Sequence, residues 1–254
     1  MISIVKAVTT RGPTIGYNAL GPRSRPNLNL LAVETSTQLC SVALLRGGEL
    51  FVEETLAENR HSEMLVPMIK RLLERSRLSA GQMDAFGFGQ GPGSFTGIRI
   101  ACGIVQGLAF AAHRPVVPVP SLLALAEQSN EGRVIAAVDA RMGEAYLAAY
   151  SRNGDDWDEV IAPRLADALS IPSLPGRRWA ATGSGFDRHP WLREAYRDAV
   201  EMRIEDDLPR AGAVARLAAR RFARGGGIAA ADAAPLYLRD KVALTTEERQ
   251  KAKR

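Results

Sequence analysis

Short apolar stretches typical of strands alternate along this chain with segments of helical period. Three apolar stretches near the start predict strands at 28–36, 40–48 and 49–57, and Gly47 with Gly48 supplies the turn before the third. A helix is predicted at 61–76, where Pro67 is expected to start or kink its regular part. The remaining elements predicted for this half are a buried strand at 83–90, a helix at 94–112, a short strand at 114–121 and a helix at 121–129.

The second half begins with a similar pattern, which suggests a duplication. Predicted strands at 133–140, 144–152 and around 158–165 follow one another, and aligning the two halves places Glu34 over Asp139. Chance similarity between strand-rich segments is the alternative explanation. Further along, the pattern predicts a strand ending in a Gly-Ser-Gly turn at 178–186, an amphipathic helix at 210–225 and a short terminal segment at 235–240.

These elements predict an α/β protein with two lobes. We expect an N-terminal lobe at 28–130 and a C-terminal lobe at 131–238, both built from sheets flanked by helices. Residues 1–27 are rich in glycine and proline without apolar periodicity, so a disordered extension is expected there. Residues 239–254 are expected to form a basic tail.

The distribution of charge argues against nucleic-acid binding by the folded part. There are 33 Lys and Arg residues against 28 Asp and Glu residues, a net charge of +5. Residues 1–33 contribute +4 and residues 239–254 contribute +3, so 5 − 4 − 3 leaves −2 for the residues between them. The basic character lies in the two ends, which are expected to be solvated tails.

Composition excludes several other classes of protein. Hydrophobic residues make up 46% and charged residues 24%, as in ordinary globular proteins and unlike disordered chains, collagens or coiled coils. The two cysteines, Cys40 and Cys102, fit neither a zinc cluster nor a disulfide scaffold, so a reducing compartment is expected. No apolar run of about 18 residues is apparent, which predicts a cytoplasmic protein without a membrane span.

The densest chemical signal is a glycine-rich loop between a strand and a helix. Gly89, Gly91 and Gly93 allow left-handed backbone conformations, and Ser94 is a suitable helix N-cap. The loop matches neither the P-loop nor the dinucleotide-binding pattern. A phosphate cradle and a tight turn that needs glycine therefore both remain open.

Six motifs together resemble the bacterial TsaB (YeaZ) family. They are ETSTQLCSVAL, HSEMLVPMI, GQGPGSFTGIRIACG, SLLALAE, VDARMGEAY and PLYLRD, in this order. The resemblance implies the two-lobed fold of actin, Hsp70 and sugar kinases, whose lobes are ribonuclease H-like. It also implies a role in placing a threonylcarbamoyl group on the adenosine beside the tRNA anticodon. In that pathway the paralogue TsaD performs the transfer and TsaE is an ATPase, so a non-catalytic scaffold or activator is expected.

One departure from the paralogue supports this division of labour. The transferase binds metal through two histidines four residues apart on its first helix, and here His61 is followed at that spacing by Leu65. Neither His113 nor His189 has a second ligand at helical spacing. We therefore expect no metal site, and His61 is expected to cap the helix or to pack at its start.

Nucleotide binding is the main alternative function that the residues suggest. Glu34, Thr35 and Ser36 resemble the phosphate turn of kinase-like folds, although many relatives have Asp at the position of Glu34. The other candidates for nucleotide contacts are Asp139, Gly183 and Gly185. An independent kinase-like ATPase or a glycoprotease-like peptidase is thus the competing hypothesis, although no G-x-S-x-G elbow exists and Ser184 lacks a base nearby in sequence. We expect that the protein requires no cofactor. Binding of ATP or ADP at an interface with a partner protein remains an alternative.

The two long helices are the predicted partner surface. Adjacent apolar stripes on the first helix exceed one buried face, and small residues recur every four positions on the second. The alternative is that both helices belong to the core. The expected interface residues are His61, Met64, Leu65, Met68, Leu72, Arg99, Gly103, Gln106 and Gly107. We expect the chain to form a heterodimer with the TsaD-type paralogue and a homodimer when it is alone. Contact with the TsaE-type ATPase and with tRNA is expected only through the complex with the paralogue.

Overall fold

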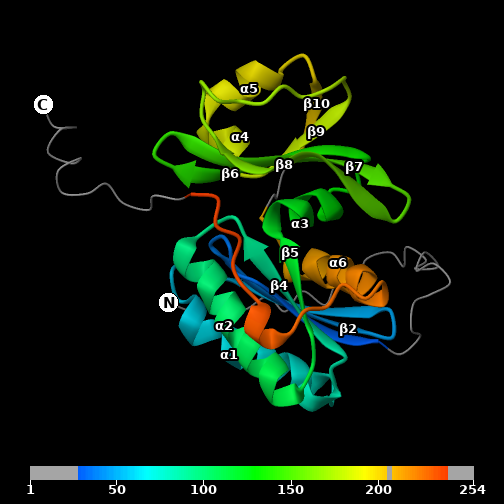
Figure 1. Cartoon of the computed structure of the whole chain (residues 1–254). Helices are drawn as coiled ribbons and strands as arrows, with labels where there is room; N and C mark the ends of the chain where they lie inside the picture. Colours follow the sequence, from blue (N-terminus) through cyan, green and yellow to red (C-terminus); the bar gives the residue numbers. More distant parts are fainter. Residues whose placement is uncertain (1–27, 205–207, 240–254) are drawn as a thin grey trace, which may run out of the picture.

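Two five-stranded sheets with helices on their faces make up the computed structural model, which describes residues 28–204 and 208–239 (Figure 1). The predictions made for residues 1–27 and for the tail after Arg239 lie outside the described residues. Both sheets are mixed, with parallel and antiparallel neighbours. The predicted two-lobed α/β fold, with mixed sheets flanked by helices, is confirmed.

The first sheet contains the predicted three-strand meander and two strands parallel to its first member. Its order is β3-β2-β1-β4-β5, where β2 is antiparallel to β1 and β3, and β4 is parallel to β1 and β5. Gly47 and Gly48 form the predicted turn, with φ of 55° and 89°. The strands are β1 (Asn29–Glu34), β2 (Leu39–Arg46), β3 (Glu49–Leu56), β4 (Ala85–Gly91) and β5 (Val116–Pro120).

The second sheet repeats this topology strand for strand. Its order is β10-β9-β6-β7-β8, with an antiparallel meander β6-β7-β8 and two parallel strands on the other side of β6. Glu34 ends β1 and Asp139 lies near the end of β6, so the duplication hypothesis gains structural support. The strands are β6 (Arg133–Arg141), β7 (Glu144–Asn153), β8 (Asp156–Ala166), β9 (Trp179–Thr182) and β10 (Val200–Arg203).

Helices cover both outer faces and fill the space between the sheets (Figure 1). Helices α1 and α2 lie on the outer face of the first sheet, α3 and α6 lie between the sheets, and α4 and α5 cover the second sheet. Their bounds are α1 (His61–Arg75), α2 (Phe95–Ala112), α3 (Ser121–Gln128), α4 (Gly185–Arg188), α5 (Pro190–Tyr196) and α6 (Ala211–Ala223), with short 3-10 turns η1 (Ala80–Gln82) and η2 (Ala230–Asp232).

Strand periodicity explains this layering. Along β1, Leu30 and Ala32 join the central core under α3 and α6, whereas Leu31 and Val33 join the core under α1 and α2. Successive side chains of a strand point to opposite faces, so an unbroken apolar strand must be covered on both sides. In β6, Val134 likewise belongs to the central core while Ile135 faces the outer core of the second sheet.

Helix α1 rules out one of the two roles expected for Pro67. The helix begins at His61 and runs through Pro67 to Arg75, so Pro67 does not start its regular part.

Helix α2 corrects the expectation that no apolar segment reaches membrane-spanning length. Within the described residues, one helix, Phe95–Ala112, has the length and composition to cross a membrane, with a mean hydropathy of 1.5. Its inner face packs against β4, with Ala101, Val105 and Ala109 fully buried. A core helix of this kind passes the same test, so its composition is weak support for a span.

The predicted lobe boundary also needs correction at the C-terminal end. Residues 131–238 were assigned to one lobe, but α6 packs against β1, β2 and β4 of the first sheet. The segment that follows α6 returns to the first sheet as well, because Ile228 forms a bridge with Val116. The second lobe is therefore built mainly from β6 to β10.

Candidate functional site

The turn after β1 is closed by its own side chains. Glu34 is fully buried, and one carboxylate oxygen accepts a hydrogen bond from the backbone N of Ser36 at 2.6 Å. The other oxygen accepts from the Ser121 hydroxyl at 2.7 Å. Burial raises the pKa of Glu34 above its ordinary value, although the hydrogen bonds from Ser36 and Ser121 oppose this. The carboxyl group is thus a structural link between β1 and α3.

The glycine-rich loop packs directly on this turn. A Cβ on Gly89 would overlap the Glu34 carboxylate, and a Cβ on Gly93 or Gly97 would overlap the backbone oxygen of Ser36 or Thr35. Of the three glycines singled out from sequence, Gly91 alone has a positive φ, at 96°. The loop needs glycine chiefly for close approach, and of these three positions the left-handed conformation that glycine allows is adopted at Gly91.

Further hydrogen bonds lock the loop against the turn. The backbone N of Ser94 donates to Ser36 O at 2.7 Å, and the Thr35 hydroxyl donates to Gly97 O at 2.8 Å. Ser94 caps α2 as predicted, since its hydroxyl accepts from Gly97 N at 3.3 Å. Glu34, Thr35 and Ser36 are all buried, so these residues do not fit a nucleotide phosphate.

The candidate residues of the second lobe are engaged in a similar way. Asp139 accepts from Arg141 N at 2.9 Å and lies 3.0 Å from Nε2 of the buried His189. The Ser184 hydroxyl lies 3.3 Å from Asp139 N, which donates to it. A Cβ on Gly183 or Gly185 would collide with Ala137, so both glycines serve close packing on β6.

The predicted partner residues of α1 lie mostly inside the protein. His61 is 6% exposed, and Leu65, Met68 and Leu72 are at most 1% exposed within the core beneath α1 and α2. The hypothesis that these four side chains form an exposed interface is therefore corrected, and His61 packs at the helix start. Met64 is half-buried at the edge of the same core.

Helix α2 retains an exposed face that contains the interface residues expected on this helix. Arg99, Gly103 and Gly107 follow one another at intervals of four residues and are exposed, and Gln106 is half-buried beside them. A Cβ on Gly103 or Gly107 would meet no atom within 4 Å. Phe110, which the sequence analysis did not single out, is 75% exposed on this helix.

A segment that sequence reasoning missed crosses α2 and reaches the second lobe. We call residues 228–239 the strap; it runs along α2 toward β6 (Figure 1). Ala233 O accepts from Gln106 Nε2 at 2.9 Å, and Leu236 N donates to Gln90 O at 2.7 Å. At its end, Arg239 donates to Ala140 O at 3.0 Å and pairs with Glu144. The PLYLRD motif was the available signal, but its sequence does not reveal what it covers.

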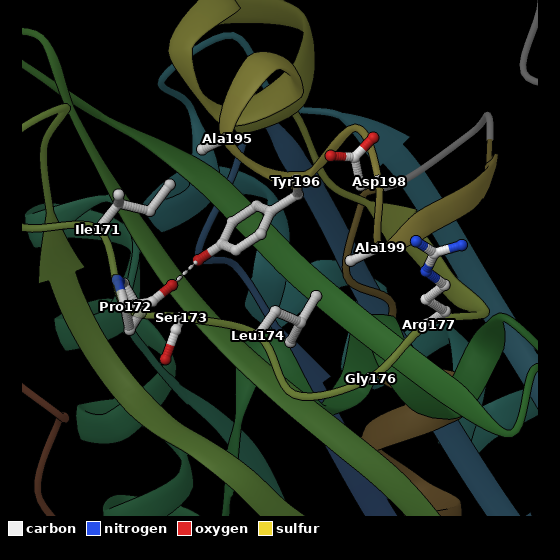
Figure 2. A pocket seen from close by; sticks show the side chains of 10 residues that line it. All are labelled: Ile171, Pro172, Ser173, Leu174, Gly176, Arg177, Ala195, Tyr196, Asp198 and Ala199. Carbon is white, nitrogen blue, oxygen red and sulfur yellow. Dashed lines mark hydrogen bonds between the residues drawn. The ribbon is translucent and has the colours of Figure 1, made fainter.

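A hollow of about 410 Å³ lies on the second lobe (Figure 2), and none of the residues predicted to form the site lines it. It is bounded by the β8–β9 connection and the end of α5, and the Tyr196 hydroxyl in it donates to Pro172 O at 2.8 Å. The lining residues are Ile171, Pro172, Ser173, Leu174, Gly176, Arg177, Ala195, Tyr196, Asp198 and Ala199.

Neither cysteine is placed as a nucleophile. Burial, reinforced by the charge of Glu53, raises the pKa of Cys40 to about 12, and burial also raises that of Cys102. Within residues 28–204 and 208–239, no three His, Cys, Asp or Glu residues gather into a group that could hold a metal ion.

Comparison with known proteins identifies relatives that cover most of this chain. Residues 52–184 match the family described as "TsaD: tRNA N6-adenosine threonylcarbamoyltransferase". Two relatives are each named tRNA threonylcarbamoyladenosine biosynthesis protein TsaB. The protein from Haemophilus influenzae is 37% identical over 229 residues, which are 85% of this chain and 95% of the relative. The one from Escherichia coli is 35% identical over 230 residues, 85% of this chain and 96% of the relative.

Solved structures agree with these relatives. A crystal structure from Pseudomonas aeruginosa, described as an uncharacterized protein with similarity to peptidase YEAZ, has a TM-score of 0.76 and 35% identity. It covers 84% of this chain and 100% of its own. A second structure, YeaZ from Pseudomonas aeruginosa, has a TM-score of 0.74 and 35% identity, covering 83% of this chain and 100% of its own. The chain belongs to the TsaB (YeaZ) family of tRNA threonylcarbamoyladenosine biosynthesis proteins.

Proposed function

We propose that the chain serves tRNA threonylcarbamoyladenosine formation as a non-catalytic partner of a TsaD-type transferase, binding it through the exposed face of α2. The observation that carries the proposal is the pair of open glycines on this helix. Gly103 and Gly107 leave a strip without side chains beside exposed Arg99 and Phe110. Such a strip lets the backbone of a partner helix approach closely.

The closed turn after β1 supports a non-catalytic role. A kinase-like ATPase needs space at this turn for phosphates, whereas Glu34 and the glycine-rich loop occupy it. We propose that the chain requires no nucleotide in its own cleft. ATP or ADP at the interface with the transferase stays a prediction.

The exposed apolar groups on α2 support self-association of the chain alone. Phe110 is 75% exposed, and a bare apolar face favours an isologous contact between two copies. The same face would then be shared between a homodimer and the heterodimer. Contact with a TsaE-type ATPase through the complex and a cytoplasmic location stay predictions of the sequence.

Reconstitution of the tRNA modification tests this function. The chain alone should show no steady ATP or peptide turnover, and it should stimulate the transferase until the two are present in equal amounts. Light scattering should report a heterodimer on mixing. Turnover by the chain alone would favour the competing ATPase or peptidase hypothesis, and failure to stimulate the transferase would refute the partner role.

A further inference from the structure

The end of the strap, the start of α2 and the β6–β7 turn together form an exposed surface of aromatic and basic side chains. We call it the arginine–aromatic surface and define it by Phe95, Arg99, Arg141, Met142 and Tyr237. Arg239, two residues after Tyr237, joins its two halves because its guanidinium reaches Met142 Sδ at 3.0 Å and Ala140 O at 3.0 Å. The strap thus brings together segments that are far apart in the sequence (Figure 1).

The centre of this surface is an arginine held between two rings. The Arg99 guanidinium carbon lies 3.4 Å from the ring centroid of Phe95 and 5.2 Å from that of Tyr237. Arg99 Nε also donates to the Tyr237 hydroxyl at 2.6 Å. Phe95 and Tyr237 nevertheless remain 40% and 46% exposed. The planar groups are therefore fixed in place while ring surface stays available to solvent, which reduces the entropy lost on binding.

The adjacent turn holds another exposed arginine, whose backbone has an uncommon conformation. Arg141 and Met142 have φ of 63° and 56°, in the left-handed region that residues other than glycine and asparagine rarely occupy. Met142 is 70% exposed, so burial of its side chain does not compensate for this conformation. Unfavourable conformations that a fold retains at exposed positions are concentrated at functional sites.

The neighbourhood is slightly basic although the body of the chain is slightly acidic. Three arginines, Arg99, Arg141 and Arg239, stand against Glu144, which pairs with Arg239, and Asp139, which accepts a hydrogen bond from Arg141 N, so the net charge is 3 − 2 = +1. Phosphate groups are suitable partners for such arginines.

We propose that the arginine–aromatic surface binds looped or single-stranded RNA directly. Aromatic rings and guanidinium planes provide stacking platforms for unpaired bases, and the surrounding arginines neutralise phosphates. The alternative partner is an acidic protein. Its carboxylates would pair with the arginines, but they would not stack on the exposed ring faces of Phe95 and Tyr237. This inference goes beyond the proposed partner function, in which tRNA is reached only through the complex.

The test measures RNA affinity of the intact chain by fluorescence anisotropy with a labelled, unmodified tRNA transcript at several salt concentrations. Binding should weaken with salt, with a slope of roughly −2 for three phosphate contacts. Arg99→Ala and Tyr237→Ala should each weaken binding about tenfold, the order expected for loss of one stacked base. Tyr237→Phe keeps the ring and should bind within about threefold of wild type on the same physical ground.

Arg197→Ala is the matched control, because this exposed arginine just beyond α5 pairs with Glu194 on the second lobe. It should leave RNA affinity unchanged. Equal affinities for wild type, Arg99→Ala and Tyr237→Ala would overturn the proposal, as would binding that does not depend on salt. If these variants instead lose only transferase association, the surface contacts protein and the RNA proposal is wrong.

The proposed partner function can be tested separately from the RNA proposal. Gly103→Leu should weaken transferase association without altering the RNA affinity of the chain alone. Circular dichroism and thermal melting identify any variant that does not fold. If Tyr237→Ala does not fold, Arg99→Ala still tests whether this surface binds RNA.

Discussion

A single buried carboxyl group determines what the turn after β1 can hold. The resemblance to kinase-like folds implies an Asp at the position of Glu34, and the longer glutamate side chain is expected to shift a magnesium-bound water. In the structure the carboxylate instead bonds Ser36 N and the Ser121 hydroxyl and fills the space beside Gly89. Such a contact joins residues 87 positions apart, which local patterns do not reveal.

Gly89→Ala should therefore destabilise the fold strongly. The added methyl would overlap the Glu34 carboxylate, which lacks free space to move because it is fully buried. We expect a loss of about 2–3 kcal/mol in the free energy of unfolding, the range for overpacking a core. Urea denaturation measures this loss. Gly132→Ala is the control, since its Cβ meets no atom within 4 Å and the change should be small; equal effects would contradict the close packing.

Glu34→Gln should preserve stimulation of the transferase and alter how stability depends on pH. Because burial raises the pKa of Glu34, the folded state holds this proton more tightly than the unfolded state. Wild-type stability should thus fall as pH rises from the ordinary value of 4.5 through the raised value, whereas the glutamine variant lacks this contribution.

Thermal melting of both proteins between pH 4 and pH 8 tests this expectation. The melting temperature of the variant relative to wild type should increase with pH. A constant difference would contradict a raised pKa, and a folded variant that fails to stimulate the transferase would return Glu34 to a functional role.

At the scale of elements, the apolar pattern predicts where α1 and α2 lie in the sequence, but it cannot tell which face of each helix is buried in the core and which is exposed. Leu65, Met68 and Leu72 lie at helical spacing, which is the same for a core and for an interface, and the structure places them in the core. Leu72→Asp would consequently test folding rather than association, because a buried charge without a partner destabilises the protein. The exposed strip on α2 was predictable because glycine repeated every four residues contributes little to a core.

Gly103→Leu now separates association from folding. The monomer has no atom within 4 Å of a Cβ at this position, and leucine favours a helix more than glycine does by roughly 0.8 kcal/mol. The variant should therefore be as stable as wild type or slightly more stable. Its affinity for the transferase, measured by calorimetry, should fall at least tenfold because the leucine blocks close approach of the partner helix. Overpacking of this kind typically costs about 1–3 kcal/mol.

Ala223→Leu at the exposed end of α6 is the matched control for added apolar bulk. It should leave association unchanged. Normal affinity of the Gly103 variant would show that the transferase binds another face.

At the scale of the whole molecule, sequence reasoning identifies two related lobes but misses how they are joined. The repeated meander and the acids at Glu34 and Asp139 indicate the duplication. The amphipathic period of α6 shows that one face is buried, yet it does not say which sheet covers that face. The strap is missed for the same reason, because its contacts with α2 and Glu144 join residues more than 90 positions apart.

A buried ion cluster in this central layer gives the last prediction. Glu127 of α3 is 5% exposed and pairs with Arg216 and Arg220 of α6. The oxygen that pairs with Arg220 Nη2 also accepts a hydrogen bond from Trp157 Nε1 at 2.8 Å. Burial alone would raise its pKa, but the hydrogen bond and charge of Arg220, with Trp157 and Arg216, together lower it. The carboxylate thus joins α3, α6 and β8 between the two sheets.

Glu127→Gln should destabilise the protein by roughly 3 kcal/mol at pH 7, because arginines that are largely buried lose their counter-charge. A lowered carboxyl pKa contributes stability that is present above the ordinary value of 4.5 and is lost as pH falls through the folded value. The difference between wild type and variant should therefore shrink in acid. Glu194→Gln, which breaks an exposed pair with Arg197, should change stability little at any pH. Denaturation curves measured from pH 7 downward decide the matter, since a difference that persists in acid would mean that Glu127 acts through packing and not through its charge.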